Sequence, residues 1–250
     1  MASVDLTDLV VESIVRDVAQ SGAITGYREP LVGFASAADP RFRDLRRIVE
    51  PTHLMPEEML PGARSVIALF LPFAARVVDA NSVHREQVAP EWSTAYVETN
   101  ALIARISAHL TGILAERGVR AAAAPATHNY DPVSLRCQWS HKSVAVIAGL
   151  GSFGLHRMVI TDAGCAGRFG SLVVDADLHL APFNARERCR YFYDSSCADC
   201  VSRCPVAALS EDGTMDKPRC HQRLLDIAAE FGAKACGKCA MGPCSLESAV

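Results

Sequence analysis

Cysteine is the residue type in this sequence with the clearest capacity for chemistry. The chain of 250 residues has ten cysteines, and eight of them lie between residue 189 and the C-terminus. The N-terminal segment has no basic stretch followed by an apolar one, so it does not have the pattern of an export signal. Disulfide bonds are therefore not expected, and cysteines this crowded indicate metal ligation.

The first cysteine group has the spacing of an iron–sulfur ligand loop. It reads CADCVSRCP from Cys197 to Pro205 and matches the end of the ferredoxin run C-x2-C-x2-C-x3-C-P. In that run the last cysteine, which precedes the proline, reaches the second cluster. The first cysteine of the run falls at Asp194 here. Cys189 is the nearest substitute, and the Asp194 carboxylate is the alternative ligand.

A second group completes a set of eight thiols, the number that two [4Fe–4S] clusters need. It consists of Cys220 and of CGKCAMGPC, which runs from Cys236 to Cys244. If the ligands interleave as in two-cluster ferredoxins, the eight thiols divide into two sets. Set A is Cys189, Cys197, Cys200 and Cys244. Set B is Cys204, Cys220, Cys236 and Cys239.

Two zinc sites are the alternative for these thiols, because C-x2-C pairs also bind zinc. The proline after the third cysteine of the first group and the interleaved spacing favour iron and sulfur. The remaining two cysteines, Cys137 and Cys165, are expected to be ordinary core or loop thiols.

The stretch SVAVIAGLGSFG (143–154) carries three glycines in the order G-x-G-x-x-G. After an apolar run expected to be a strand, this order is the fingerprint of a dinucleotide-binding turn. Such a turn must open a helix. The following LHRMVITDAGCAGRFG (155–170) has adjacent β-branched residues and several glycines, which favour a strand and a loop. We therefore expect a cofactor turn of another kind.

Composition and hydrophobic periodicity set the framework for these motifs. With 50% hydrophobic and 21% charged residues the chain should fold, and a net charge of −3 without a charged block argues against a general nucleic-acid surface. The longest apolar run, SVIALFLPFAARVV (65–78), is too short to span a bilayer and is interrupted by Pro72 and Arg76. We expect a soluble, cytoplasmic protein.

Helical periodicity predicts helices near residues 6–18 and 99–117, and a helix-like segment at 219–232. A buried strand is predicted at 64–72, and further strands or short elements are predicted at 119–126, 143–148, 156–161 and 171–178. The composition changes near residues 183–187. We therefore expect a cofactor or substrate domain over residues 1–185 and a cysteine-rich domain over residues 186–250.

Several segments together resemble the epoxyqueuosine reductase and reductive dehalogenase superfamily. They are LPGARSVIALFLP (60–72), SHKSVAVIAGLGSFGLHRMVIT (140–161), GRFGSLVVDADL (167–178) and the cysteine tail. The resemblance implies an α+β fold, with a nitroreductase-like domain of the corrinoid-binding type followed by a small two-cluster ferredoxin-like domain. It also implies a base-off cobalamin with one cluster near the corrin. The residues that the resemblance implies at the cofactor are those of the glycine motif: Gly149, Leu150, Gly151 and Gly154. Their charge and position make Lys142 and Arg168 further candidates, for contacts to the propionamide or phosphate side of a corrinoid.

The sequence departs from that superfamily in two places. Leu155 stands where epoxyqueuosine reductases have a lysine, and SLRCQWS (134–140) has no carboxylate where they have an acidic segment. The helical repeats that many of them place after the clusters are not in this sequence. The general acid and the reduction of a modified tRNA base are therefore not carried over.

A reduction at low-valent cobalt needs a proton donor nearby. The segments THNYDP (127–132) and SHK (140–142) supply the catalytic candidates, which are Tyr130, Asp131 and His141. A histidine titrates near neutral pH, and a tyrosine can protonate a strongly basic intermediate. Each also has a structural interpretation, because Asp131-Pro132 is a good turn pair and His141 could act as a cap or bridge.

Three functions remain open from the sequence. The first is a cobalamin-dependent reductase that receives electrons through two clusters. The second is an electron-transfer or reductive-activation protein without a catalytic cofactor of its own. The third is a flavin reductase, since nitroreductase-like domains otherwise hold FMN. We expect an external low-potential electron donor of the ferredoxin or flavodoxin type, a small-molecule or modified-nucleoside substrate and, by analogy, a homodimer.

Overall fold

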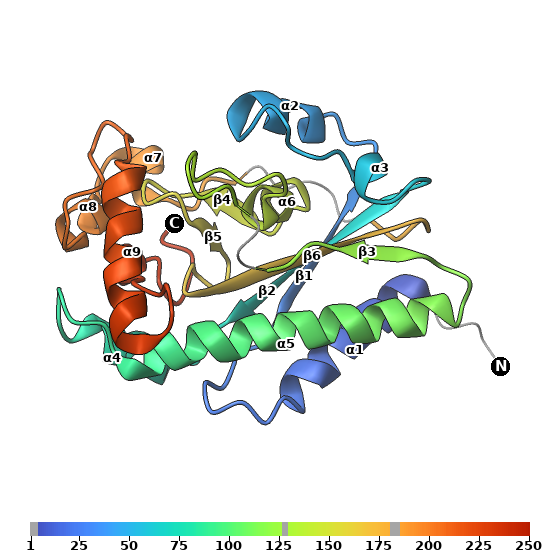
Figure 1. Cartoon of the computed structure of the whole chain (residues 1–250), viewed down its shortest axis with the longest axis horizontal. Coiled ribbons are helices and arrows are strands. Elements are labelled where there is room, and N and C mark those ends of the chain that lie inside the picture. Colours follow the sequence, from blue (N-terminus) through green and yellow to red (C-terminus); the bar gives the residue numbers. More distant parts are fainter. Residues whose placement is uncertain (1–4, 127–129, 181–185) are drawn as a thin grey trace.

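A four-stranded antiparallel sheet in the order β1-β2-β6-β3 is the framework of the part of the chain before the cysteine-rich segment, called the first domain below as in the prediction (Figure 1). The structure is a computed structural model that describes residues 5–126, 130–180 and 186–250. The strands are β1 (Leu31–Ser36), β2 (Ser65–Pro72), β3 (Ala121–Ala123) and β6 (Gly167–Val174). Strand β2 is buried at every position and pairs along its whole length with β6. The continuous apolar run predicted at 64–72 is therefore the central strand, as expected.

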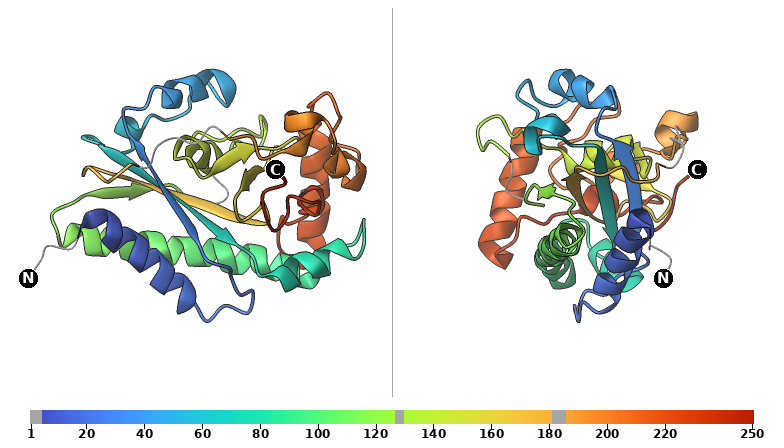
Figure 2. Two further views of the ribbon diagram at one scale, coloured as in Figure 1. Left: turned by 180° about the vertical axis from the view of Figure 1, so that it is seen from behind. Right: turned by 90° about the vertical axis from the view of Figure 1, so that its right-hand side faces the viewer.

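Helices cover both faces of this sheet (Figures 1 and 2). On one face lie α1 (Leu6–Ala19) and α5 (Pro90–Ala115), and on the other lie α2 (Arg41–Ile48), α3 (Pro56–Met59) and α6 (His141–Ile147). Alternate residues of β2 supply the two cores, with Ile67 and Leu69 toward α5, and Ala68 and Phe70 toward α6. Within the described residues, no helix is long and apolar enough to cross a membrane.

The strand predicted at residues 143–148 is wrong, because this segment is the helix α6. The Ser140 hydroxyl accepts a hydrogen bond from the backbone N–H of Ser143, which caps the helix start. Val144 and Ala145 are buried against the sheet. A short apolar run fits a buried strand and a buried helix equally well, and here the cap decides between them. The glycine motif thus follows a helix rather than a strand.

The other predicted elements are present, with different bounds. The predicted helix at 99–117 begins earlier, at the start of α5, and the segments 119–126 and 171–178 overlap β3 and β6. The segment 156–161 contains β5 (Val159–Thr161), which pairs with β4 (Gly151–Phe153) in a two-stranded sheet. The chain is therefore a mixed α/β protein with an antiparallel sheet.

The cysteine-rich segment packs at one end of the main sheet (Figure 1). Its elements are α7 (Arg190–Asp194), α8 (Asp199–Arg203), α9 (Lys217–Phe231) and the 3-10 helix η1 (Lys238–Ala240). It shares one apolar core with the first domain, in which Phe73 and Trp92 contribute beside Ala235 and Met241. The predicted boundary after residue 185 borders residues 181–185, which lie outside the described residues.

Arg28 connects the C-terminal segment to the first domain. Its guanidinium donates three hydrogen bonds to backbone carbonyls, at 2.6 Å to Leu246, 2.8 Å to Ala163 and 3.0 Å to Phe73. These three carbonyls belong to segments that are far apart in the sequence. One side chain thus holds the end of the chain against the edge of the sheet.

Replacing Arg28 with Ala should destabilise the protein by about 3 kcal/mol, because three charge-assisted hydrogen bonds are lost and their carbonyls lose a donor. The midpoint of urea unfolding measures this change. Arg47→Ala is the control, because the Arg47 side chain is 79% exposed on α2. Equal midpoints for the two variants would contradict the connecting role of Arg28.

Candidate metal centres and the adjoining cavities

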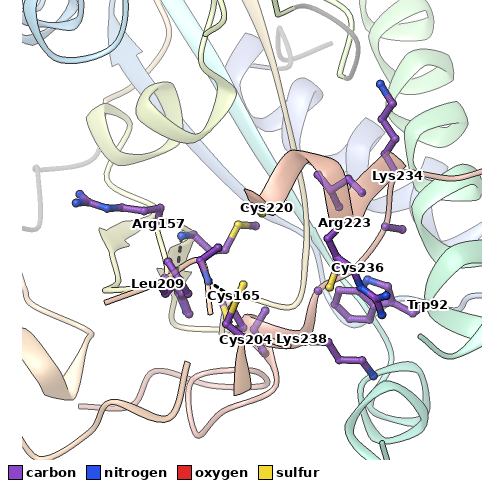
Figure 3. A pocket seen from close by; sticks show the side chains of 18 of the residues that line it. Trp92, Arg157, Cys165, Cys204, Leu209, Cys220, Arg223, Lys234, Cys236 and Lys238 are labelled. Carbon is purple, nitrogen blue, oxygen red and sulfur yellow. Dashed lines mark hydrogen bonds between the residues drawn. The ribbon is translucent and has the colours of Figure 1, made fainter. Parts of the chain in front are cut away.

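The structure brings the thiols of each predicted set together. A small cavity is lined by the four cysteines of set A and by Cys239, and a larger one, named the inner cavity here, is lined by the four cysteines of set B. Figure 3 shows Cys204, Cys220 and Cys236 of set B around this inner cavity. Cys239 lines both spaces, so the two sets are neighbours.

Short elements position these thiols. Cys189 precedes α7, Cys200 lies on α8, and Cys204 follows α8 with its sulfur accepting the Ala208 N–H at 3.2 Å. Cys220 lies in the first turns of α9, one face of which is buried against the domain core. Because helix ends and tight turns separate successive cysteines, each thiol can approach a shared centre from a different direction.

Burial and neighbouring thiols raise the pKa of three members of these sets. Burial raises the pKa of Cys200 to about 12 and that of Cys220 to about 11, and it raises the pKa of Cys239 even further. For Cys200 the contributing thiols are the other three of set A. Such thiols stay protonated unless a metal ion displaces the proton. Both sets therefore have the donor chemistry of metal centres.

The pKa of Cys244 in set A is lowered, not raised. The thiol of Cys165, at 3.9 Å, and the imidazole of His156 both donate hydrogen bonds to its sulfur and lower its pKa to about 5. The Nδ1 atom of His156 accepts the backbone N–H of Met158, so the ring proton is on Nε2, 3.3 Å from the Cys244 sulfur. These three groups also lie close enough together to share a metal ion.

The inner cavity extends from set B toward the sheet. Its volume is about 300 Å³, and an outer cavity of about 260 Å³ lies beside it and is open to solvent. The two spaces share four lining residues: Lys142, Met158, Gly167 and Arg168. Two of the predicted cofactor residues, Lys142 and Arg168, therefore line a space in which a ligand could bind next to set B.

The four residues of the glycine motif lie elsewhere. Within the described part of the chain, Gly149, Leu150, Gly151 and Gly154 line neither cavity. Gly149 ends α6 with a positive φ of 81°, and Leu150 is buried. A side chain at Gly151 would lie 2.2 Å from the Ile160 carbonyl oxygen. In this structure the motif allows close packing of the β4–β5 hairpin.

The three predicted proton donors have different surroundings. His141 is buried, its Nε2–H donates to the Pro125 carbonyl oxygen at 3.0 Å, and its Nδ1 accepts from the Ser171 hydroxyl at 2.7 Å. Burial also lowers its pKa. Both ring nitrogens are thus engaged, which favours the bridging interpretation. The exposed Asp131 accepts the backbone N–H groups of residues 133 and 134, as a turn carboxylate does.

Tyr130 contacts the cysteine-rich segment. Its hydroxyl oxygen accepts a hydrogen bond from Lys234 Nζ at 2.8 Å and lies 3.3 Å from Nε2 of His221. Lys234 lines the inner cavity. Lys234 and His156 were not predicted as site residues, because each is a single residue without a motif. Cys165, which was expected to be an ordinary thiol, instead contacts a member of set A.

Comparison with known proteins identifies the fold. No family model and no curated protein matches the sequence, whereas 27 solved chains match the structure. Epoxyqueuosine reductase from Bacillus subtilis has a TM-score of 0.61 at 18% identity, over 96% of this chain and 66% of that chain. The enzyme from Streptococcus thermophilus has a TM-score of 0.59 at 17% identity, over 95% and 66%.

A catabolic reductive dehalogenase in complex with 3-bromo-4-hydroxybenzoic acid has a TM-score of 0.57 at 16% identity, over 88% of this chain and 30% of that chain. The chain thus spans just under two thirds of the length of the epoxyqueuosine reductases and less than a third of the dehalogenase. The resemblance inferred from the sequence is confirmed at the level of the fold, which this chain shares with both groups.

The turn between Cys236 and Cys239 offers a test of how set B is positioned. Gly237 has a φ of 67°, and a Cβ there would lie 2.2 Å from the Trp92 ring. Gly232→Ala is the matched control, because Gly232 has a φ of 70° but nothing within 4 Å. Both alanines should cost about 1 kcal/mol in backbone strain, and only Gly237→Ala should also displace the set B cysteines.

We therefore expect Gly237→Ala to lose bound metal and to unfold at lower denaturant than Gly232→Ala, as measured by elemental analysis and by denaturant titration. Equal metal contents in the two variants would show that this turn does not position set B.

Proposed function

We propose that this protein is an iron–sulfur reductase in which set A and set B each hold one [4Fe–4S] cluster. The observation that carries the proposal is the division of eight thiols between two neighbouring spaces, one of which continues into a cation-lined cavity. Iron–sulfur clusters transfer single electrons, and the cavity next to set B provides room for the group that is reduced. On this proposal residues 1–185 are a nitroreductase-like domain and residues 186–250 a ferredoxin-like one.

The order of the two sets suggests an electron path. Set A lies beside α7, where Phe192 is 49% and Tyr193 65% exposed, and an external donor protein could approach there. Set B lines the inner cavity, and Cys239 borders both sets. Electrons would therefore enter at set A, pass to set B and reach the cavity. A ferredoxin or flavodoxin fits the role of donor.

The cavity residues fit a corrinoid held without a histidine ligand. One matching structure, a reductive dehalogenase, is described as suggesting a mechanism for B12-dependent dehalogenation. In this chain the two histidines that line the cavities, His141 and His156, have both ring nitrogens engaged. Lys142 and Arg168 offer N–H donors to amide and phosphate oxygens. When bound, a corrinoid would supply low-valent cobalt as the reductant of the substrate.

Tyr130 is our candidate proton donor: it lines neither cavity, but its partner Lys234 lines the inner one. The ammonium group of Lys234 donates to its hydroxyl oxygen, so a positive charge would stabilise the phenolate that remains after proton transfer. The buried His141 would hold the start of α6 in place through Ser171 and Pro125 rather than donate a proton. One matching structure contains an epoxyqueuosine-modified tRNA stem loop, and a modified nucleoside is accordingly one candidate substrate here.

Metal and cofactor content test this proposal. After anaerobic purification and incubation with cobalamin or FMN, we expect roughly eight iron atoms per chain and retention of one of the two cofactors. Iron with neither cofactor retained would favour an electron carrier, for which the outer cavity has no purpose. Zinc in place of iron would contradict the cluster assignment.

Substitutions in each set should remove one cluster at a time. Cys200→Ser in set A and Cys239→Ser in set B should each reduce the iron content to about half. Cys137→Ser is the matched control, because Cys137 lines the outer cavity and belongs to neither set. Unchanged iron in both set variants would overturn the assignment.

His156 should tune the cluster at set A. Hydrogen bonds to a cluster sulfur raise its reduction potential because they stabilise the more negative reduced state. His156→Ala removes the N–H that points at Cys244, so one cluster should shift to a more negative potential in an EPR-monitored redox titration. His109→Ala on α5, where His109 pairs with Asp17, should leave both potentials unchanged. An unshifted His156→Ala protein with full iron would refute the tuning role.

A further inference from the structure

The charge around the two cavities is one-sided. Six basic side chains line the inner cavity: Lys142, Arg157, Arg168, Arg223, Lys234 and Lys238. Among the described residues that line the inner or the outer cavity, none is an aspartate or a glutamate. Cations gathered without a carboxylate partner raise the free energy of the protein unless another negative charge is present. A negatively charged group is therefore expected near these cations.

For two of these cations, Lys238 and Arg223, the proposed function supplies the negative charge. Lys238 donates to the backbone carbonyl and the side-chain oxygen of Asn81 at 2.6 and 3.0 Å, and it adjoins Cys239 in the chain. Arg223 lies on α9 one turn after Cys220, and its buried Nε has no hydrogen-bond partner in the part of the chain that the structure describes. A cluster with four thiolates is negatively charged, and it would balance these two cations.

Lys142 and Arg168 also line the outer cavity, where no thiol of set A or set B is present. The set B thiols of Cys220 and Cys239 interact electrostatically with Lys142 from the inner cavity, but they do not reach into the outer one. Lys142 Nζ donates to the Arg157 carbonyl oxygen at 2.8 Å. Arg168 Nε donates to Asn100 Oδ1 at 2.6 Å, and its guanidinium stacks on the Tyr96 ring at 4.2 Å. All these partners are neutral. Burial lowers the pKa of both cations, which records their desolvation.

The remaining wall of the outer cavity is largely apolar. Trp139 and Phe169 are 2% and 6% exposed, and Met158 joins them. A cavity of about 260 Å³ with two cations and an apolar wall is suited to a small molecule that has one anionic group and an apolar body. A neutral ligand of the same size would leave Arg168, whose contacts are with Asn100 and Tyr96, without a counter-charge.

We propose that the outer cavity is a binding site for a small organic anion, whose carboxylate or phosphate group contacts Lys142 and Arg168. The proposal deepens the proposed function, because it names the class of ligand that the reductase cavity accepts. The anionic group could belong to the substrate or to the phosphate of a bound cofactor. The chemistry of recognition is the same for both, and the experiment separates them.

Calorimetric titration of the anaerobically purified protein tests the site with three probes: inorganic phosphate, butyrate and butyramide. The last two have the same size and shape and differ in charge. We expect phosphate and butyrate to bind and butyramide to fail. Lys142→Gln and Arg168→Gln should each weaken phosphate binding about tenfold or more, because each removes a charge-assisted hydrogen bond.

Two controls isolate the effect of charge. Arg168→Lys keeps the positive charge and should retain more affinity than Arg168→Gln, which separates charge from folding. Arg47→Gln alters an exposed arginine on α2 and should bind phosphate like the wild type. Iron content should be equal in all these proteins. A protein without iron that still binds phosphate would contradict the proposed function and leave the anion site standing.

The source of the anionic group follows from a second titration, on protein loaded with cobalamin or FMN. Phosphate binding that is lost on loading assigns the site to the cofactor phosphate, and unchanged binding assigns it to the substrate. The anion site is refuted if phosphate does not bind the wild type, if butyramide binds as tightly as butyrate, or if both glutamine variants bind phosphate like the wild type.

Discussion

The architecture of this protein depends on the contact between its C-terminal segment and the turn that joins β5 to β6. The backbone N–H groups of Cys165 and Ala166 donate to the carbonyl oxygens of Cys244 and Ser245 at 2.9 and 3.0 Å. This pairing returns the last cysteine of set A to the first domain. The other members of set A lie between residues 189 and 200, so the same pairing fixes the position of Cys244 relative to the preceding part of the chain.

The same contact determines the electrostatics of the thiols. Where a thiol is surrounded by apolar side chains and other thiols, as Cys200 and Cys220 are, burial raises its pKa and favours the protonated form. At Cys244, two donors from the first domain reverse this effect. A metal bound to the other thiols would have to displace protons, so on the proposed function the folding of the cysteine-rich segment and metal binding would be coupled.

The sequence was most informative where a residue type has a fixed spacing. The spacing of the eight cysteines predicts two sets if the ligands interleave as in two-cluster ferredoxins. In the structure the four cysteines of set A line one cavity and those of set B another, with Cys239 lining both. The central strand β2 was also evident, since its continuous apolar run is long and ends at a proline. Helix α6 was not, because seven apolar-rich residues carry no periodicity that separates helix from strand. The hydroxyl of Ser140, which caps the first turn, favours the helix.

The residues missed from the sequence have no local signal. His156 and Lys234 act through partners at positions 244 and 130, and nothing in the intervening sequence predicts those contacts. The glycine motif is ambiguous for a related reason. Its spacing is compatible with a cofactor turn and with a tight hairpin, and the approach of the Ile160 carbonyl to Gly151 explains the need for glycine in the hairpin.

The distribution of charge gives the two thiol sets unequal surroundings. The small cavity of set A is lined by one cation and one anion, Arg190 and Asp199, whereas the inner cavity beside set B is lined by six cations and, among its described lining residues, no carboxylate. A reduced cluster carries an extra negative charge, which cations stabilise. If the two sets hold clusters as proposed, the field of the protein would favour electrons at set B over set A, on the side of the cavity. The hydrogen bonds from His156 and Cys165 to Cys244 act in the opposite direction at set A. The difference in reduction potential between clusters at the two sets would thus be the balance of a field from many charges and two specific contacts.

An anion bound at Lys142 and Arg168 would neutralise part of that field, so the occupancy of the cavity and the reduction potential at set B would be coupled.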